Sequence, residues 1–153
     1  MVRLTDLKAA QAERYAGIEC PDFATTPWVG GPPLSERRVA IVASAGLVLR
    51  GEPPFRGGDG DFRVIPGRVA PDQLLLSHIS INLDRSGFQE DWNVVLPLDR
   101  FRELAAERRI GSVAATHYSF MGATDPARME EHARTVAGRL KQDRVDAVLL
   151  SPV

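Results

Sequence analysis

The sequence is poor in the residues that build disulfide frameworks and metal clusters: it has one cysteine and three histidines in 153 residues. A single cysteine, Cys20, cannot form a disulfide within the chain, and so few soft ligands exclude a cysteine-rich zinc site. No apolar run is long enough to span a bilayer, and the charged N-terminus does not resemble a signal peptide, so we expect a cytoplasmic protein. The formal net charge of -1 gives no broad basic surface for nucleic acid or anionic membranes.

The length predicts one domain, residues 1–153. Residues 2–16 have helical spacing, with Leu4, Leu7, Ala10 and Tyr15 close to one face. Residues 17–37 are rich in proline and glycine, which predicts an irregular segment that wraps the domain surface.

The rest of the chain alternates apolar runs with helical segments. "RVAIVASAGLVLRG", "QLLLSHIS", "SVAATHYSFMG" and "VDAVLLSPV" predict four strands, and their continuous apolar character suits strands buried on both faces. Residues 51–72 predict a long loop with a short extended piece at 62–65. One helix is predicted from Pro97 to Gly111, with Phe101, Leu104 and Ala105 buried. Another is predicted after an Asp125 N-cap, with an inward stripe of Met129, Ala133, Val136 and Leu140.

This alternation predicts an α/β fold: a parallel-sheet, three-layer domain of Rossmann-like or flavodoxin-like type. Such sheets bind ligands at the carboxyl ends of their strands. The residues expected there are Ser44, Ser77, His78, His117, Tyr118, Ser119, Ser151 and Pro152.

"THYSFMG" gives the first candidate site. His117, Tyr118 and Ser119 are proton-capable side chains at a strand end. His117 could act as a general acid or as an oxyanion-type donor, and a structural strand end is an equal alternative. Because the chain lacks GxSxG, a serine hydrolase is disfavoured.

"SHISINLDRSGFQEDWN" gives the second. His78 ends an apolar run, and with Asp84 and Asp91 it could form an acid–base or metal group, although acids in a polar loop are usually solvated. A hydrogen-bonded structural histidine remains an equal alternative. In "SAGLVLRG" a tight strand-exit turn is favoured over a nucleotide loop, because the P-loop lysine is missing. Trp28 and Trp92 are expected to be packing anchors, and Cys20 lacks the surroundings of a catalytic thiol.

Several stretches together resemble the selenoprotein B family of the glycine, sarcosine, betaine and D-proline reductases. They are "FATTPW", "RVAIVASAGLVLRGEPPF", "FRVIPG", "LSHIS", "NVVLPLDRFRELAAERRIGSVAATHYSFMG" and "DRVDAVLLSPV". The resemblance runs from about residue 2 to Val153, is most specific from Asn93 to Gly122, and is strongest to the short D-proline reductase-like branch.

The resemblance implies that a selenocysteine, or a cysteine, follows Val153. We therefore expect this sequence to be an N-terminal portion of a reductase subunit, ended by a UGA codon taken as stop, with a fold incomplete at its C-terminus. An apolar strand at 145–153 would then lie at a sheet edge or in an incomplete core, and the chain should be poorly soluble or oligomeric.

The resemblance also implies reductive cleavage of a C–N bond in an amino acid or amine. It implies a pyruvoyl group on a partner subunit and a dithiol electron donor. His117 and His78 would be the catalytic candidates, and Ser44, Ser77, Asn93, Tyr118 and Ser119 would contact substrate. No metal is expected, and the chain itself lacks the redox nucleophile.

Two alternatives stay open. One is a short binding or regulatory module that keeps the scaffold without the redox motif. The other is an unrelated hydrolase or transferase that uses His117.

Overall fold

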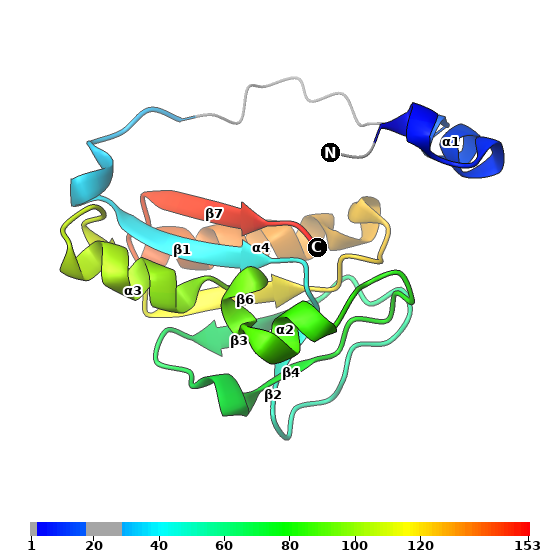
Figure 1. Cartoon of the computed structure of the whole chain (residues 1–153). Coiled ribbons are helices and arrows are strands. Elements are labelled where there is room, and N and C mark those ends of the chain that lie inside the picture. Colours follow the sequence, from blue (N-terminus) through cyan, green and yellow to red (C-terminus); the bar gives the residue numbers. More distant parts are fainter. Residues whose placement is uncertain (1–2, 18–28) are drawn as a thin grey trace. The chain divides into compact units, whose positions relative to one another are not determined.

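A computed structural model describes residues 3–17 and 29–153 (Figure 1). The chain divides into two units, residues 1–30 and 31–153. In the first, a 3-10 turn at Leu4–Asp6 precedes helix α1, Ala9–Ala16, and no residue of either is buried. The helix predicted over 2–16 is confirmed for Ala9–Ala16; the chain is extended at Leu7, and residue 2 lies outside the described residues. Most of the predicted irregular segment, with Cys20 and Trp28, lies outside the described residues.

The second unit is built on a mainly parallel sheet whose central strand is β1, Arg38–Ala43. On one side β1 pairs in parallel with β7, Ala147–Ser151. On its other side it pairs in parallel first with β5, Ser112–Val113, and then with β6, Thr116–Phe120. Strand β3, Phe62–Pro66, ends the sheet antiparallel to β6. The predicted α/β class is confirmed.

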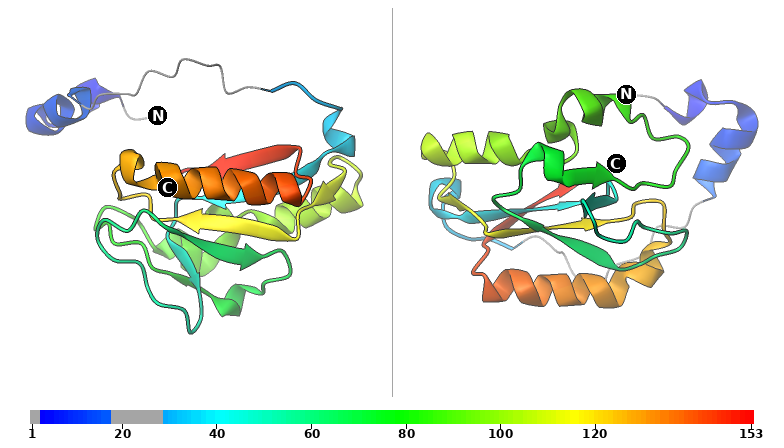
Figure 2. Two further views of the ribbon diagram at one scale, coloured as in Figure 1. Left: turned by 180° about the vertical axis from the view of Figure 1, so that it is seen from behind. Right: turned by 90° about the horizontal axis from the view of Figure 1, so that it is seen from below.

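Helices cover both faces of this sheet and give three layers (Figure 2). Helix α3, Leu98–Ala106, packs on one face, where Leu98 joins a cluster with Ile41 and Leu47. Helix α4, Glu130–Gln142, lies on the other face, where Val136 packs against Tyr118 and Phe120. The predicted α4 stripe is confirmed for Met129, Val136 and Leu140, which share that cluster.

Shorter elements connect these layers. Helix α2 covers Ser86–Glu90, and further 3-10 turns cover Leu34–Glu36, Pro71–Gln73, Trp92–Val94 and Pro126–Met129. Trp92 is buried in the α3-side cluster, which confirms it as a packing anchor.

The first and second predicted strands differ from the structure in length and in the sheet to which they belong. The run after β1 does not continue as one strand: β2, Leu47–Leu49, pairs antiparallel with β4, Leu74–Leu76, in a separate two-stranded sheet. The chain turns at Gly46, whose φ of +66° favours glycine. A Cβ at this position would also meet the backbone of His78. As a result β4 does not belong to the parallel sheet.

The predicted burial of the last strand is wrong. Val148, Leu149 and Leu150 of β7 are 40%, 38% and 70% exposed. The reason is position: β7 pairs only with β1, so its second edge has no strand beside it among residues 31–153.

Candidate functional site

Three strand ends converge on Ser44, the residue that follows β1. Its backbone N–H donates to the carbonyl of Ser151 at 3.0 Å, and its own carbonyl accepts from Gly122 N–H at 2.8 Å. Its side-chain Oγ accepts the backbone N–H of Val153 at 2.9 Å. Ser44 therefore ties the exits of β1, β6 and β7 together at the carboxyl edge of the sheet, where parallel sheets place their ligands.

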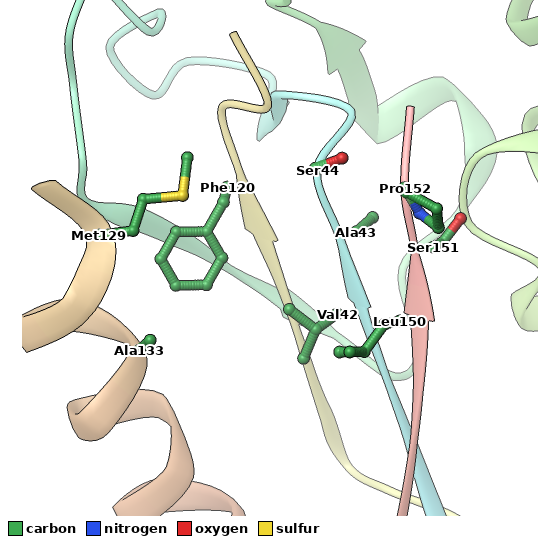
Figure 3. A pocket seen from close by; sticks show the side chains of 9 residues that line it. All are labelled: Val42, Ala43, Ser44, Phe120, Met129, Ala133, Leu150, Ser151 and Pro152. Atoms are coloured by element: carbon green, nitrogen blue, oxygen red, sulfur yellow. The ribbon is translucent and has the colours of Figure 1, made fainter. Parts of the chain in front are cut away.

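An open apolar groove of about 270 Å³ lies beside this junction, between α4 and the strand ends (Figure 3). Met129 and Ala133 form its helical wall, and Val42 and Leu150 lie on the strand side. The complete lining is Val42, Ala43, Ser44, Phe120, Met129, Ala133, Leu150, Ser151 and Pro152. The groove suits an aliphatic or small cyclic group next to a hydroxyl.

Two hydroxyls border the groove and differ in their hydrogen bonds. Ser151 Oγ donates to the carbonyl of Val95 at 3.0 Å. Ser44 Oγ only accepts, from Val153, and its O–H meets no acceptor within the described part of the chain. Ser44 is therefore the hydroxyl that can donate to a bound group.

His117 lies inside the sheet and is fully buried. Between β5 and β6 the register against β1 slips by two residues, since Val39 faces Val113 but Val42 faces Tyr118. The His117 imidazole fills this interruption, because its Nδ1 accepts the backbone N–H of Ile41 at 3.0 Å. Burial is the largest cause that lowers the pKa of His117 to about 4, with a smaller effect of Arg102. His117 is therefore neutral at pH 7, with its proton on Nε2.

The neighbours of His117 on β6 divide between the two faces of the sheet. Ser119 Oγ accepts the backbone N–H of Leu47 at 2.8 Å on the α3 side. Tyr118 lies on the α4 side and stacks edge-on against Phe62, and burial raises the pKa of its phenol. The three polar residues of "THYSFMG" do not converge, and none of them lines the groove.

His78 and Ser77 hold the loop that leaves β4. Ser77 Oγ accepts the backbone N–H of Phe55 at 2.8 Å, and His78 Nδ1 accepts that of Ser80 at 3.1 Å. Burial, and then the charge of Arg85, lower the pKa of His78. The Nε2 atoms of His78 and His117 are both buried and find no partner among the described residues.

Asn93 lies in the 3-10 turn before α3 and bonds to the first turn of that helix. Its Oδ1 accepts the backbone N–H of Asp99 at 3.0 Å, and its Nδ2 donates to the carboxylates of Asp91 and Asp99. Asp99 also accepts from Trp92 Nε1 and from Arg102. The amide of Asn93 is thus fully engaged within this network.

Of the residues predicted to act in catalysis or to contact substrate, only Ser44 lines the groove. Ser151 and Pro152, which the sequence predicted at the same edge of the sheet, line it as well. Sequence analysis missed Phe120, Met129, Ala133 and Leu150 as lining residues. Met129 and Ala133 were already on the predicted inward stripe of α4, so the helical spacing could have identified these two lining residues.

Within residues 3–17 and 29–153, no three His, Cys, Asp or Glu side chains are grouped as metal ligands would be. No helix in that part of the chain is both long and apolar enough to cross a membrane.

Comparison with known proteins gives a consistent result. A family model described as glycine/sarcosine/betaine reductase selenoprotein B matches residues 75–153. D-proline reductase subunit gamma of Acetoanaerobium sticklandii is 34% identical over 154 residues, which cover 99% of this chain and 62% of that protein. Betaine reductase complex component B subunit beta of Peptoclostridium acidaminophilum is 28% identical over 126 residues.

Glycine reductase complex component B subunit gamma of Carboxydothermus hydrogenoformans is 29% identical over 124 residues. The matches to these glycine and betaine reductase proteins cover 77% of this chain and 28% of each relative. The chain thus spans less than two thirds of the length of these relatives. No solved structure matches the chain.

Proposed function

Since the chain belongs to the glycine/sarcosine/betaine reductase selenoprotein B family, we propose that it is a subunit of a reductase complex that cleaves a C–N bond of an amino acid or amine. The names of its relatives support a complex, because they are described as subunits or components. A cytoplasmic location is part of this proposal.

The observation that carries this proposal is the hydrogen bond from Val153 N–H to Ser44 Oγ at the edge of the apolar groove. The family resemblance implies a selenocysteine or cysteine directly after the stretch that matches residues 145–153. The groove fits such a group, because the backbone at Val153 is held against the hydroxyl whose O–H is free to donate. When present, the selenol supplies a nucleophile that is ionised at neutral pH, and a pyruvoyl group on a partner subunit would activate the substrate.

The residues of this chain then bind and orient the substrate. Phe120, Met129 and Leu150 contact its apolar carbon atoms and exclude water from them. Ser44 donates its hydroxyl proton to a substrate carboxylate or to the ionised redox residue. In the overall reaction the C–N bond takes up two electrons and two protons, while a dithiol donor is oxidised to a disulfide.

We assign positioning roles, rather than proton transfer, to the two buried histidines. His117 Nδ1 is used by Ile41 and His78 Nδ1 by Ser80, and neither side chain lines the groove. A general acid must reach the leaving nitrogen directly or through one water. Proton transfer to the amine is therefore assigned to water admitted at the open side of the groove.

The test uses the protein from its native source, purified with the subunits that accompany it. The complex is incubated with dithiothreitol and, separately, with D-proline, glycine or betaine. Reductive C–N cleavage opens D-proline to 5-aminopentanoate, releases ammonia from glycine, or releases trimethylamine from betaine. Consumption of one substrate with its product supports the proposal. An intact complex that turns over none of the three contradicts it.

A non-catalytic binding module is the second candidate. It is favoured by the given sequence, in which the only cysteine, Cys20, lies far upstream of the expected redox motif and outside it. This candidate predicts that the 153-residue chain binds D-proline, glycine or betaine in calorimetry, and that the native complex releases no reduced product.

A further inference from the structure

Helices α3 and α4 end in the same way, on an arginine in the left-handed backbone conformation. Arg108, just after α3, has a φ of +58°, and Arg144, just after α4, has a φ of +55°. No other residue except glycine has a positive φ in the part of the chain that the structure describes. Residues with a Cβ rarely adopt this conformation, so the two positions share a local strain.

The hydrogen bonds at both helix ends identify the motif. In each case the arginine N–H donates to the carbonyl three residues earlier, at 3.0 Å. The next N–H donates to the carbonyl five residues before it, at 2.8 Å after α3 and at 2.9 Å after α4. This is the Schellman motif, whose left-handed residue is usually glycine. The helix dipole does not explain arginine there, because Arg109 and Lys141 already place positive charge at the two helix ends.

Both arginines flank the end of the sheet at which its parallel strands begin (Figure 1). Arg38, the first residue of β1, pairs with Ser112, and its carbonyl accepts the backbone N–H of Asp146 at 2.9 Å. Arg108 precedes Ser112 by four residues, and Arg144 precedes Asp146 by two. The arginines thus approach the start of β1 from helices on opposite faces, at the far end of the sheet from the groove.

Positive charge is in excess at this end, although the whole chain has a net charge of -1. Asp143 binds the guanidinium of Arg38 at 2.8 Å, and the carboxylate of Asp146 accepts its backbone N–H at 3.0 Å. Arg108 and Arg144 are exposed, and neither forms an ion pair with a described residue. The segments at this end hold six basic and four acidic residues; they are residues 36–38, 107–111 and 141–146.

We propose that Arg108 and Arg144 form a docking surface for an acidic surface on another subunit of the proposed complex. A strained backbone that persists at two equivalent exposed positions indicates a role for the side chain that glycine would lack. Guanidinium groups bind carboxylates bidentately, and arginine is enriched at protein interfaces. Glu36 and Glu107 lie among the basic residues and repel a continuous row of phosphates, which favours a protein over a nucleic acid.

Docking at this end leaves the groove at the other end of the sheet accessible. The inference rests on the proposed complex and does not depend on the proposed reaction. Because the contact is electrostatic and exposed, retention of the partner should weaken as the salt concentration rises from about 0.05 to 0.5 M.

The test compares tagged variants of the chain, expressed in its native source and recovered with the subunits that accompany them. Arg108→Gly combined with Arg144→Gly should retain about a tenth or less of the subunits that the wild type retains at low salt. The melting temperature of the chain itself should stay unchanged or rise, because glycine relieves the left-handed backbone. A merely structural role for the arginines predicts a lower melting temperature and full retention.

Two further variants separate charge from backbone. Arg108→Gln combined with Arg144→Gln keeps the strain, removes both charges and should also lose the subunits. Arg56→Gln combined with Arg128→Gln is the matched control: both arginines are exposed and form no ion pair with a described residue, and they lie outside this end of the sheet. This control should retain the subunits as the wild type does.

Retention by the Arg108 and Arg144 variants up to the same salt concentration as the wild type overturns the inference. Release of the subunits by nuclease overturns it as well, because a nucleic acid then bridges them. A wild-type chain that carries no other subunit overturns both the inference and the complex. A complex that assembles through the two arginines but turns over no substrate supports the inference and contradicts only the proposed reaction.

Discussion

His117 Nδ1 accepts the backbone N–H of Ile41 at 3.0 Å, so a side chain replaces a backbone carbonyl in the ladder between β1 and β6. The bond requires the neutral imidazole, because both ring nitrogens are donors once it is protonated. Protonation would turn an acceptor into a donor facing another donor, inside the sheet. The sequence predicted His117 at the carboxyl end of a strand, whereas it is the second residue of β6 and makes a structural contact there.

Acid should therefore destabilise the fold through His117. Its pKa is lowered from 6.5 to about 4, so the unfolded chain binds this proton more tightly than the folded chain. The contribution is fully present above pH 6.5 and is lost as the pH falls towards 4; over that range it amounts to about 3 kcal/mol. Urea unfolding at successive pH values measures it.

His117→Gln should lower stability at pH 7 and flatten the pH dependence between 6.5 and 4. His78 shifts in the same direction, so the comparison is best made in a His78→Asn background. If the pH dependence of unfolding is the same with and without His117, the neutral buried imidazole is disproved.

Removal of the Asn93 side-chain amide should destabilise the first turn of α3. Asn93→Ala removes the acceptor for Asp99 N–H and a donor to the Asp99 carboxylate. We expect a loss of about 1–3 kcal/mol in the free energy of unfolding, from urea titration. Asn82→Ala is the control, since Asn82 is exposed and its side chain makes no hydrogen bond in the described structure, so its effect should stay within about 0.5 kcal/mol. Equal effects of the two substitutions would refute the capping role.

How far the sequence predicts this molecule depends on the distance between interacting residues. The α4 stripe follows from the spacing of Met129, Val136 and Leu140, because helical neighbours are three or four residues apart. The junction at Ser44 joins residues 109 positions apart, and no local pattern reports which strands will be neighbours. The exposure of Leu150 likewise depends on which strands pair with β7 among residues 31–153, while its apolar character alone predicts burial.

Two glycines should respond in opposite ways to alanine. A Cβ on Gly111 would collide with the backbone of Glu36 and lie 2.8 Å from Arg37 N, so Gly111→Ala should destabilise the fold by about 2–4 kcal/mol. Gly138 lies within α4, and its added Cβ would meet nothing within 4 Å. Gly138→Ala should therefore stabilise by about 0.5–1 kcal/mol. Thermal melts of both variants decide this, and a stable Gly111→Ala would show that the close approach is absent.

Filling the groove should block binding without unfolding the chain. Ala133 lines the groove and is exposed on the helical wall, so an indole can be added there without displacing core atoms. In the native complex, Ala133→Trp should lower kcat/KM by about tenfold or more for whichever of the three substrates the complex turns over. This corresponds to about 1.4 kcal/mol of lost binding. The melting temperature should change little, because the substitution removes no packed contact.

Thr135→Trp is the matched control for this prediction. Thr135 is exposed on the same helix two residues away, and it does not line the groove. Successive helical residues are about 100° apart, so positions 133 and 135 face nearly opposite directions. Thr135→Trp should leave kcat/KM unchanged. If both variants lose activity equally, the defect lies in α4 as a whole; if neither does, the substrate binds outside the groove, and Ser44 is then no part of the site.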